Sequence, residues 1–247
     1  MEAITAEVVA VRDLTHDVRE LDLQLRTPPQ LAFQPGQFIS FEIPVEGKPH
    51  PATRAYSIAS PPSQADRLTL LFNRVAHGPG TQFLFGLARG TVVQCKGAAG
   101  SFRLRDDGGK ALLFVATGTG IAPLRSMILA KLAATPDAQV RLLWGLRSQR
   151  DLYYQDELAA LATRHPNFFY TVALSKPEAG WTGANGRVTT LVRERVTSVT
   201  NLVVYLCGHG DMIRDVTATV HALGLCPIYR EKWYDEPVAR PTGAPAD

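Results

Sequence analysis

The spacing of apolar residues changes near residue 108, and this change constrains the fold more than any other feature of the sequence. Before it, short segments place an apolar residue at every second position, as in residues 5–11, 18–25 and 37–43. After it, continuous apolar runs such as 111–116 alternate with segments whose apolar residues recur at helical spacing. Alternation is typical of a strand with one buried face, and an unbroken run of a parallel strand covered on both faces. The chain is therefore predicted to form two different domains.

The first half is predicted to be an antiparallel β-barrel or sandwich. Pairs such as Pro35-Gly36 and Pro61-Pro62 interrupt its alternating segments. Short strands separated by such turn residues are typical of this class. One helix is expected, around residues 81–87. The expected strands are residues 5–11, 18–25, 37–43, 53–59, 68–72 and 92–95.

The second half is predicted to be a doubly wound α/β domain with a parallel sheet. Its apolar strands alternate with amphipathic helices along the chain, a pattern that places helices on both faces of the sheet. A polar, glycine-bearing turn at 106–109 marks the boundary. The chain is accordingly divided into a barrel domain at 1–107, an α/β domain at 108–234 and a C-terminal tail at 235–247.

Composition excludes several classes of protein. The 247 residues are 45% hydrophobic with a net charge of +3, which excludes a disordered chain and gives no reason to expect nucleic-acid binding. The apolar runs are far shorter than the roughly 20 residues that cross a bilayer, and no leader is visible, so we expect a cytoplasmic protein without a membrane span. Three cysteines are too few for the four thiolates of a common iron–sulfur cluster, and no metal is expected.

The first turn of the second half, from Thr117 to Pro123, is the clearest candidate for a binding site. Its sequence Thr-Gly-Thr-Gly-Ile-Ala-Pro joins an apolar strand to a helix. Glycines allow a sharp turn, and the N-terminus of a helix offers unpaired N–H groups to a phosphate. Pro123 stands where the usual dinucleotide motif has its third glycine. A tight turn with no ligand explains this segment alone equally well.

A polar strand in the first half is a second candidate. It reads Arg54-Ala55-Tyr56-Ser57, and alternation places Arg54 and Tyr56 on one face. Arginine suits a phosphate and tyrosine suits stacking on a planar ring. The glycine loop at 77–81, His-Gly-Pro-Gly-Thr, precedes the expected helix and again describes an anion site. Taken singly, these segments are explained as an ordinary polar strand face and a capped loop.

The last candidate, residues 205–212, reads Tyr-Leu-Cys-Gly-His-Gly-Asp-Met at the end of a late parallel strand. Ligands of open α/β sheets bind outside the carboxyl ends of the strands, so Cys207 would face the same crevice as Thr119. A lone cysteine at the end of a strand is also readily explained by packing.

These four segments occur together and in order, and in that arrangement the chain resembles the ferredoxin-NADP reductase superfamily. The shared motifs are Arg-x-Tyr-Ser, a glycine loop ending in Ser or Thr, Gly-Thr-Gly-Ile-Ala-Pro and Tyr-Leu-Cys-Gly. Intermediate landmarks agree, among them Pro35-Gly36-Gln37-Phe38 and Ser175-Lys176. The resemblance runs from the first strands to about Trp233.

The resemblance implies a flavin-binding barrel followed by a nicotinamide-dinucleotide domain, with FAD as the flavin. It implies that Arg54 pairs with the FAD pyrophosphate, that Tyr56 stacks on the flavin ring and that Ser57 bonds near its N5 atom. The FAD-binding residues that it implies are Arg54, Ala55, Tyr56, Ser57, Phe72, Asn73, Arg74, Gly78, Gly80, Thr81 and Trp233.

The same resemblance implies an NAD(P)H site at the turn 118–123, with Thr119 and Cys207 beside the nicotinamide. Ser57 and Cys207 are the implied catalytic residues. Cations at the implied adenosine end favour NADPH over NADH only weakly, because Arg147 also occurs in relatives that use NADH. The NAD(P)-binding residues that it implies are Gly118, Thr119, Gly120, Ile121, Ala122, Pro123, Gly145, Arg147, Ser175, Lys176, Arg187, Cys207, Gly208 and Met212.

The resemblance implies an NAD(P)H reductase of the EC 1.18.1 type, which accepts hydride at the flavin and releases single electrons. With too few cysteines for a cluster of its own, the chain is expected to pass them to a separate ferredoxin or flavodoxin, with an oxygenase as one destination. Two alternatives stay open: an electron-transfer flavin subunit of a larger redox complex, and a binding protein that has lost its cofactors.

Overall fold

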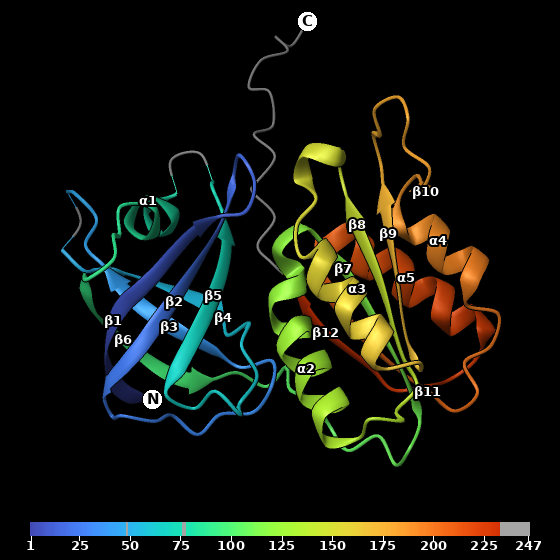
Figure 1. Ribbon diagram of the computed structural model, residues 1–247, viewed down its shortest axis with the longest axis horizontal. Helices are drawn as coiled ribbons and strands as arrows, with labels where there is room; N and C mark the ends of the chain where they lie inside the picture. The colour runs from blue at the N-terminus through green and yellow to red at the C-terminus, as the bar shows by residue number, and fades with distance from the viewer. Residues whose placement is uncertain (48, 76–77, 233–247) are drawn as a thin grey trace, which may run out of the picture.

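The computed structural model describes residues 1–47, 49–75 and 78–232, and within them the strands form two sheets of six strands each. The two sheets lie side by side in Figure 1, the first built from the blue to green part of the chain and the second from the green to red part. Trp233 and the predicted tail at 235–247 lie outside the described residues. The predicted succession of an antiparallel domain and a parallel α/β domain is confirmed.

The first sheet is antiparallel, in the order β4-β3-β6-β1-β2-β5. A bridge between Ile58, just after β4, and Leu70 on β5 joins its two edges and curls the sheet into a barrel. The helix α1 (Pro79–Phe85) lies at one end of it. The strands are β1 (Glu2–Asp13), β2 (Val18–Thr27), β3 (Phe38–Ile43), β4 (Ala52–Ser57), β5 (Arg67–Asn73) and β6 (Val92–Ala99).

The second sheet is parallel, in the order β10-β9-β8-β7-β11-β12. Its strands are β7 (Ala111–Thr117), β8 (Val140–Leu146), β9 (Phe168–Leu174), β10 (Ala184–Asn185), β11 (Leu202–Gly208) and β12 (Ile228–Lys232). Its helices are α2 (Ile121–Ala134), α3 (Gln155–Arg164), α4 (Val188–Arg195) and α5 (Gly210–Leu223), with single turns of 3-10 helix at η1 (Gly118–Gly120) and η2 (Gln149–Asp151). None of the described helices is long and apolar enough to cross a membrane.

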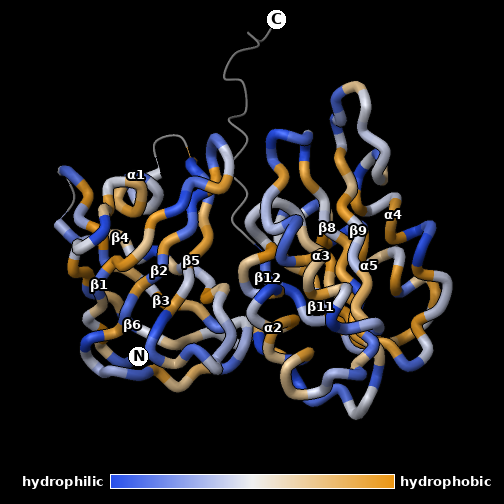
Figure 2. The backbone as a smooth tube through the Cα atoms, viewed as in Figure 1, coloured by the Kyte–Doolittle hydropathy of each residue, from blue (hydrophilic) through white to orange (hydrophobic). Residues whose placement is uncertain are grey.

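Apolar side chains gather in separate cores. One core fills the barrel around Ile39 and Phe41. The parallel sheet has a core on each face, with Trp144 under α2 and α3 and Val115 under α4 and α5. Figure 2 shows the matching alternation, with orange segments in the strands and blue segments in the surface loops.

The parallel sheet reverses its strand order at β7, because β8 lies on one side of β7 and β11 on the other. Ligands of such sheets bind at this reversal, outside the carboxyl ends of the strands. The edge strand β12 was not predicted from the sequence. Its residues, Ile-Tyr-Arg-Glu-Lys, are mostly polar, as the edge of a sheet allows.

Two glycines let the ends of β7 and β11 touch. A Cβ on Gly208 would lie 2.2 Å from Thr117 Oγ1, and a Cβ on Gly120 would lie 2.4 Å from the carbonyl oxygen of Cys207. Gly208 also has a φ of +138°, a backbone conformation that other residues rarely adopt. The N–H of His209 donates to Thr117 Oγ1 at 2.9 Å and closes the contact.

The substitution Gly208→Ala is expected to lower the free energy of unfolding by at least about 2 kcal/mol, because it adds both backbone strain and a steric clash. Gly180→Ala is the matched control, since Gly180 has a φ of +87° and nothing within 4 Å of a Cβ. Denaturant unfolding of both variants measures the difference. Equal losses in the two variants would show that the contact with Thr117 contributes nothing.

Candidate active site

A cavity of about 880 Å³ lies where β7 and β11 end, and residues of both domains line it. The barrel contributes Asp17, Val18, Asn73 and Val75. Its volume falls within the roughly 300–1,000 Å³ of ordinary small-molecule sites. Eleven of the residues predicted to bind a cofactor line it: Asn73, Gly118, Thr119, Gly120, Gly145, Arg147, Ser175, Lys176, Arg187, Gly208 and Met212.

Four residues predicted for the NAD(P)H site are buried behind the cavity lining. Ile121, Ala122 and Pro123 form the first turn of α2 and are buried, and the first two belong to the core. Cys207 is 0% exposed and belongs to the core of the α/β domain. Direct contact of these four with a cofactor stays a prediction.

The glycine turn at 118–120 is open on one side and held on the other. Gly118 has a φ of +52°, and nothing lies within 4 Å of a Cβ built on it. Its carbonyl oxygen accepts hydrogen bonds from Trp144 Nε1 at 3.0 Å and from Tyr153 Oη at 3.1 Å. The turn therefore has room for a phosphate group next to the start of α2, where the helix dipole favours negative charge.

Three cations, Arg147, Lys176 and Arg187, are exposed along the cavity. Within the described part of the chain, none of them pairs with a carboxylate. Two of the carboxylates that line the cavity have other partners: Asp151 accepts hydrogen bonds from Ser148, and Asp211 forms an ion pair with an arginine on α5. The cavity thus offers unpaired positive charge to an anionic ligand, and its residues fit a nicotinamide dinucleotide.

The predicted flavin residues Arg54 and Tyr56 lie against the start of α1. A Cβ on Gly80 would lie 2.4 Å from Tyr56 Oη and 2.9 Å from Arg54 Cγ, which places both side chains on one face of β4 as predicted. The guanidinium of Arg54 is exposed and donates to the carbonyl of Thr53 at 2.9 Å. It pairs with no carboxylate among the described residues, so its charge remains available to a pyrophosphate.

The face of β4 is less polar than its sequence indicates. Tyr56 is 7% exposed, and its ring meets those of Phe41 and Phe72 edge-on, at 6.0 and 5.8 Å between centroids. Burial raises the pKa of Tyr56 to about 12, so the phenol keeps its proton at neutral pH. Any stacking of Tyr56 on a flavin therefore uses a ring that the barrel core already holds.

The other predicted flavin residues that the structure describes lie on β4, at the end of β5 and at the start of α1. Thr81 Oγ1 donates to the carbonyl oxygens of Val75 and Gly78, both at 3.1 Å. The Arg74 guanidinium lies 4.1 Å from the ring centroid of Phe85. Ala55 is exposed and Phe72 is buried. Trp233 lies outside the described residues.

One functional candidate that sequence reasoning missed is Glu231. Its Oε2 lies 3.5 Å from Ser57 Oγ, at the outer limit of a hydrogen bond. The register of β12 on β11 places Glu231 opposite Cys207. Burial raises the pKa of Glu231 to about 7, and the bond from Ser57 lowers it by less. The structure thus adds a carboxyl group that titrates near neutral pH to the predicted pair of Ser57 and Cys207.

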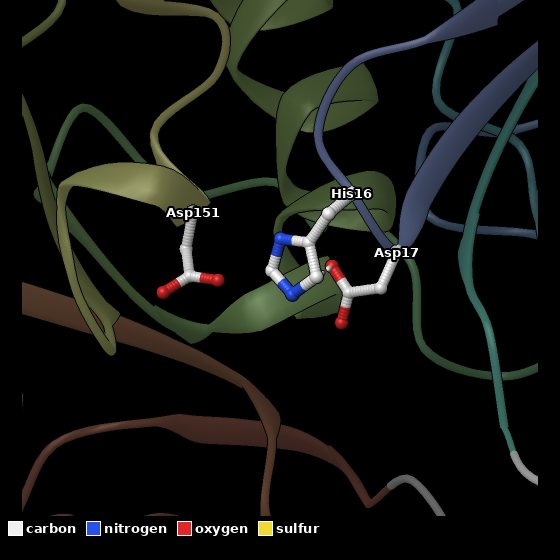
Figure 3. Close-up of side chains that lie close together, drawn as sticks. All are labelled: His16, Asp17 and Asp151. Atoms are coloured by element: carbon white, nitrogen blue, oxygen red, sulfur yellow. Dashed lines mark ion pairs between the residues drawn. The ribbon is translucent and has the colours of Figure 1, made fainter.

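A further cluster consists of His16, Asp17 and Asp151 (Figure 3), and its two aspartates line the cavity. One potential ligand atom from each lies within 4.8 Å of the others. The group spans the two domains, but Asp17 accepts from Thr15, and Asp151 caps η2. Local hydrogen bonding therefore explains both carboxylates.

Comparisons with known proteins agree with this geometry. Residues 5–104 match the family described as oxidoreductase FAD-binding domain, and residues 114–218 match oxidoreductase NAD-binding domain. Ferredoxin–NADP reductase B of Sorangium cellulosum is 37% identical over 219 residues, which cover 86% of this chain and 88% of that protein.

Two further relatives come from oxygenase systems. The ferredoxin–NAD(P)(+) reductase component of the naphthalene 1,2-dioxygenase and salicylate 5-hydroxylase systems of a Ralstonia species is 31% identical, over 94% of this chain and 69% of that protein. The crystal structure of Amycolatopsis cytochrome P450 reductase GcoB superposes with a TM-score of 0.85 and 31% identity, over 94% of this chain and 69% of that one. This chain therefore belongs to the ferredoxin-NADP reductase superfamily of FAD- and NAD(P)H-dependent oxidoreductases.

Proposed function

We propose that this protein takes hydride from NAD(P)H and passes the electrons one at a time to a separate ferredoxin or flavodoxin that serves an oxygenase. The observation that carries the proposal is the cavity, in which the glycine turn of the α/β domain meets strand β5 of the barrel. Relatives named as reductases of ferredoxin and of dioxygenase systems support the choice of acceptor.

FAD, when bound, supplies the chemistry that converts the electron pair of a hydride into single electrons. The protein holds the reacting groups in position. Thr119 Oγ1 donates to Asn73 Oδ1 at 3.1 Å, and this bond ties the glycine turn to β5. Holding two reactants in a fixed geometry makes their reaction effectively intramolecular.

Glu231, with Ser57 beside it, would bind and release the proton that accompanies electron transfer. Hydride input and single-electron output change the charge of the flavin, so a group that gains or loses a proton near pH 7 is useful beside it. The Glu231 carboxyl has that property, and Ser57 Oγ is the atom next to it on the barrel side. We assign Glu231 the role of holding this proton.

The reductase activity can be tested by anaerobic stopped-flow mixing of the purified protein with each coenzyme. NADPH and NADH are both expected to bleach the flavin absorbance, and NADPH faster, because of the unpaired cations in the cavity. Added ferredoxin should then restore the absorbance through a second, separate phase. Absence of bleaching with either coenzyme would overturn the proposed function.

Removing cavity cations should change the preference between coenzymes. Lys176→Ala and Arg187→Ala are each expected to raise the KM for NADPH about tenfold, the loss of one charge-assisted hydrogen bond, with less than a twofold change for NADH. Arg193→Ala is the control, because Arg193 is exposed on α4 and is absent from the cavity lining. Equal effects on the two coenzymes would show that neither cation binds the ribose 2′-phosphate, the group that NADPH has and NADH lacks.

The raised pKa of Glu231 predicts a specific dependence of stability on pH. Between about 4.5 and 7 the folded protein holds a proton that the unfolded chain releases, so the free energy of unfolding falls as pH rises through this range. Relative to Glu231→Gln, the cofactor-free wild type should lose about 1–3 kcal/mol between pH 4.5 and 7.5. Denaturant unfolding at both pH values measures it, with the exposed Glu46→Gln as control. A pH-independent difference would refute the assigned titration.

A further inference from the structure

The boundary between the domains contains a partly buried polar contact that the proposed function has not used. The hydroxyl of Tyr154, the residue before α3, donates to Glu20 Oε2 on β2. Glu20 is 4% exposed, and its Oε1 accepts from Arg12 Nε at 2.7 Å. Burial raises the pKa of Tyr154 well above its usual range, so its hydroxyl keeps the proton that it donates. A buried carboxylate with both oxygens bonded fixes the direction from which its partners approach.

The backbone of Tyr154 has an unusual conformation at this contact. Its φ of +56° lies in the left-handed region, which a bulky residue seldom occupies. Asn201, in the loop before β11, is the other non-glycine residue with a positive φ among those that the structure describes. Such strain persists where the surrounding structure enforces it, and it gathers at functional sites.

Tyr153 connects the same point of the chain to the cavity. Its hydroxyl donates to the carbonyl of Gly118 in the glycine turn, and its ring lies 5.1 Å from that of Tyr154. Two consecutive tyrosines therefore reach in different directions. One holds the turn of the α/β domain, and the other holds Glu20 in the barrel.

Arg125 of α2 contacts Tyr154 and also binds the barrel. Its guanidinium lies 4.9 Å from the ring centroid of Tyr154 and donates to both carboxylate oxygens of Glu157 at 2.7 Å. Its remaining arm, Nη1, donates to the carbonyl of Ala59 in the barrel at 2.8 Å. A planar guanidinium with all of these partners has little freedom to move.

We propose that Glu20, Arg125 and Tyr154 form an interdomain latch, and that Tyr154 is a positioning residue for hydride transfer. The inference rests on the proposed function. In that reaction a hydrogen leaves the reduced nicotinamide with its electron pair and is accepted by FAD, which is reduced. By holding the glycine turn at a fixed separation from the barrel, the latch sets the distance that the hydride travels. A misplacement of about 1 Å can cost a hundredfold in rate.

The test compares Tyr154→Phe, which removes the hydroxyl and keeps the ring, with Tyr170→Phe. Tyr170 is a partly buried tyrosine of β9 that stacks on Phe168. Hydrogen exchange on the FAD-loaded proteins should show at least threefold faster exchange in the glycine turn and in β2 for Tyr154→Phe alone. Saturating NADPH should reduce its flavin about tenfold more slowly, with the Kd for NADPH within twofold of wild type.

Glu20→Gln supplies the reciprocal variant. If the two residues act through one contact, the double variant should reduce its flavin no more than about twofold slower than Tyr154→Phe. Unchanged exchange in Tyr154→Phe would overturn the latch, and faster exchange with an unchanged saturated rate would overturn its role in positioning. Were wild type inert with both coenzymes, the proposed function would fail, while the exchange comparison would still decide whether the latch joins the domains.

Discussion

The site depends on how closely the ends of β7 and β11 approach one another. Gly120 and Gly208 have no side chains to separate these strands, and Thr117 Oγ1 accepts the N–H that follows β11. The helices α2 and α5, which cover opposite faces of the sheet, both begin at the carboxyl ends of these strands, at Ile121 and Gly210. Two helix N-termini near one cavity reinforce each other's preference for negative charge. The contact between strands thus creates the anion site before any charged side chain is considered.

Directional polar bonds, in addition to packing, join the domains. Ser126 Oγ, fully buried on α2, donates to the carbonyl of Ser60 at 2.7 Å, close to the bond from Arg125 to Ala59. Apolar burial is non-directional and tolerates sliding, whereas hydrogen bonds weaken steeply when their angles change. A boundary fixed in this way suits a protein whose two cofactors must meet at one distance.

The sequence predicted what depends on local pattern and missed what depends on neighbours. Both sheets and the glycine turn at 118–120 follow from hydrophobic period and glycine placement. The strand β12 was not predicted because this edge strand has no apolar run, and Glu231 was missed for the same reason. The sequence also did not indicate a role for Glu20. Its burial and its bond to Tyr154, which is 134 positions away in the sequence, arise only in the folded protein.

The cations that line the cavity do not lower the pKa of Glu231, which is absent from the cavity lining. A cation near a carboxyl group lowers its pKa, and Arg147, Lys176 and Arg187 would do so if they lay beside Glu231. They line the cavity, whereas Glu231 is absent from its lining and meets Ser57 at the end of β4, and burial and Ser57 account for its shift. The cavity cations are therefore not among the groups that shift the pKa of Glu231. Because no cation is among the causes of its pKa shift, the carboxyl is not held in its charged form by the side chains that would bind an anionic coenzyme.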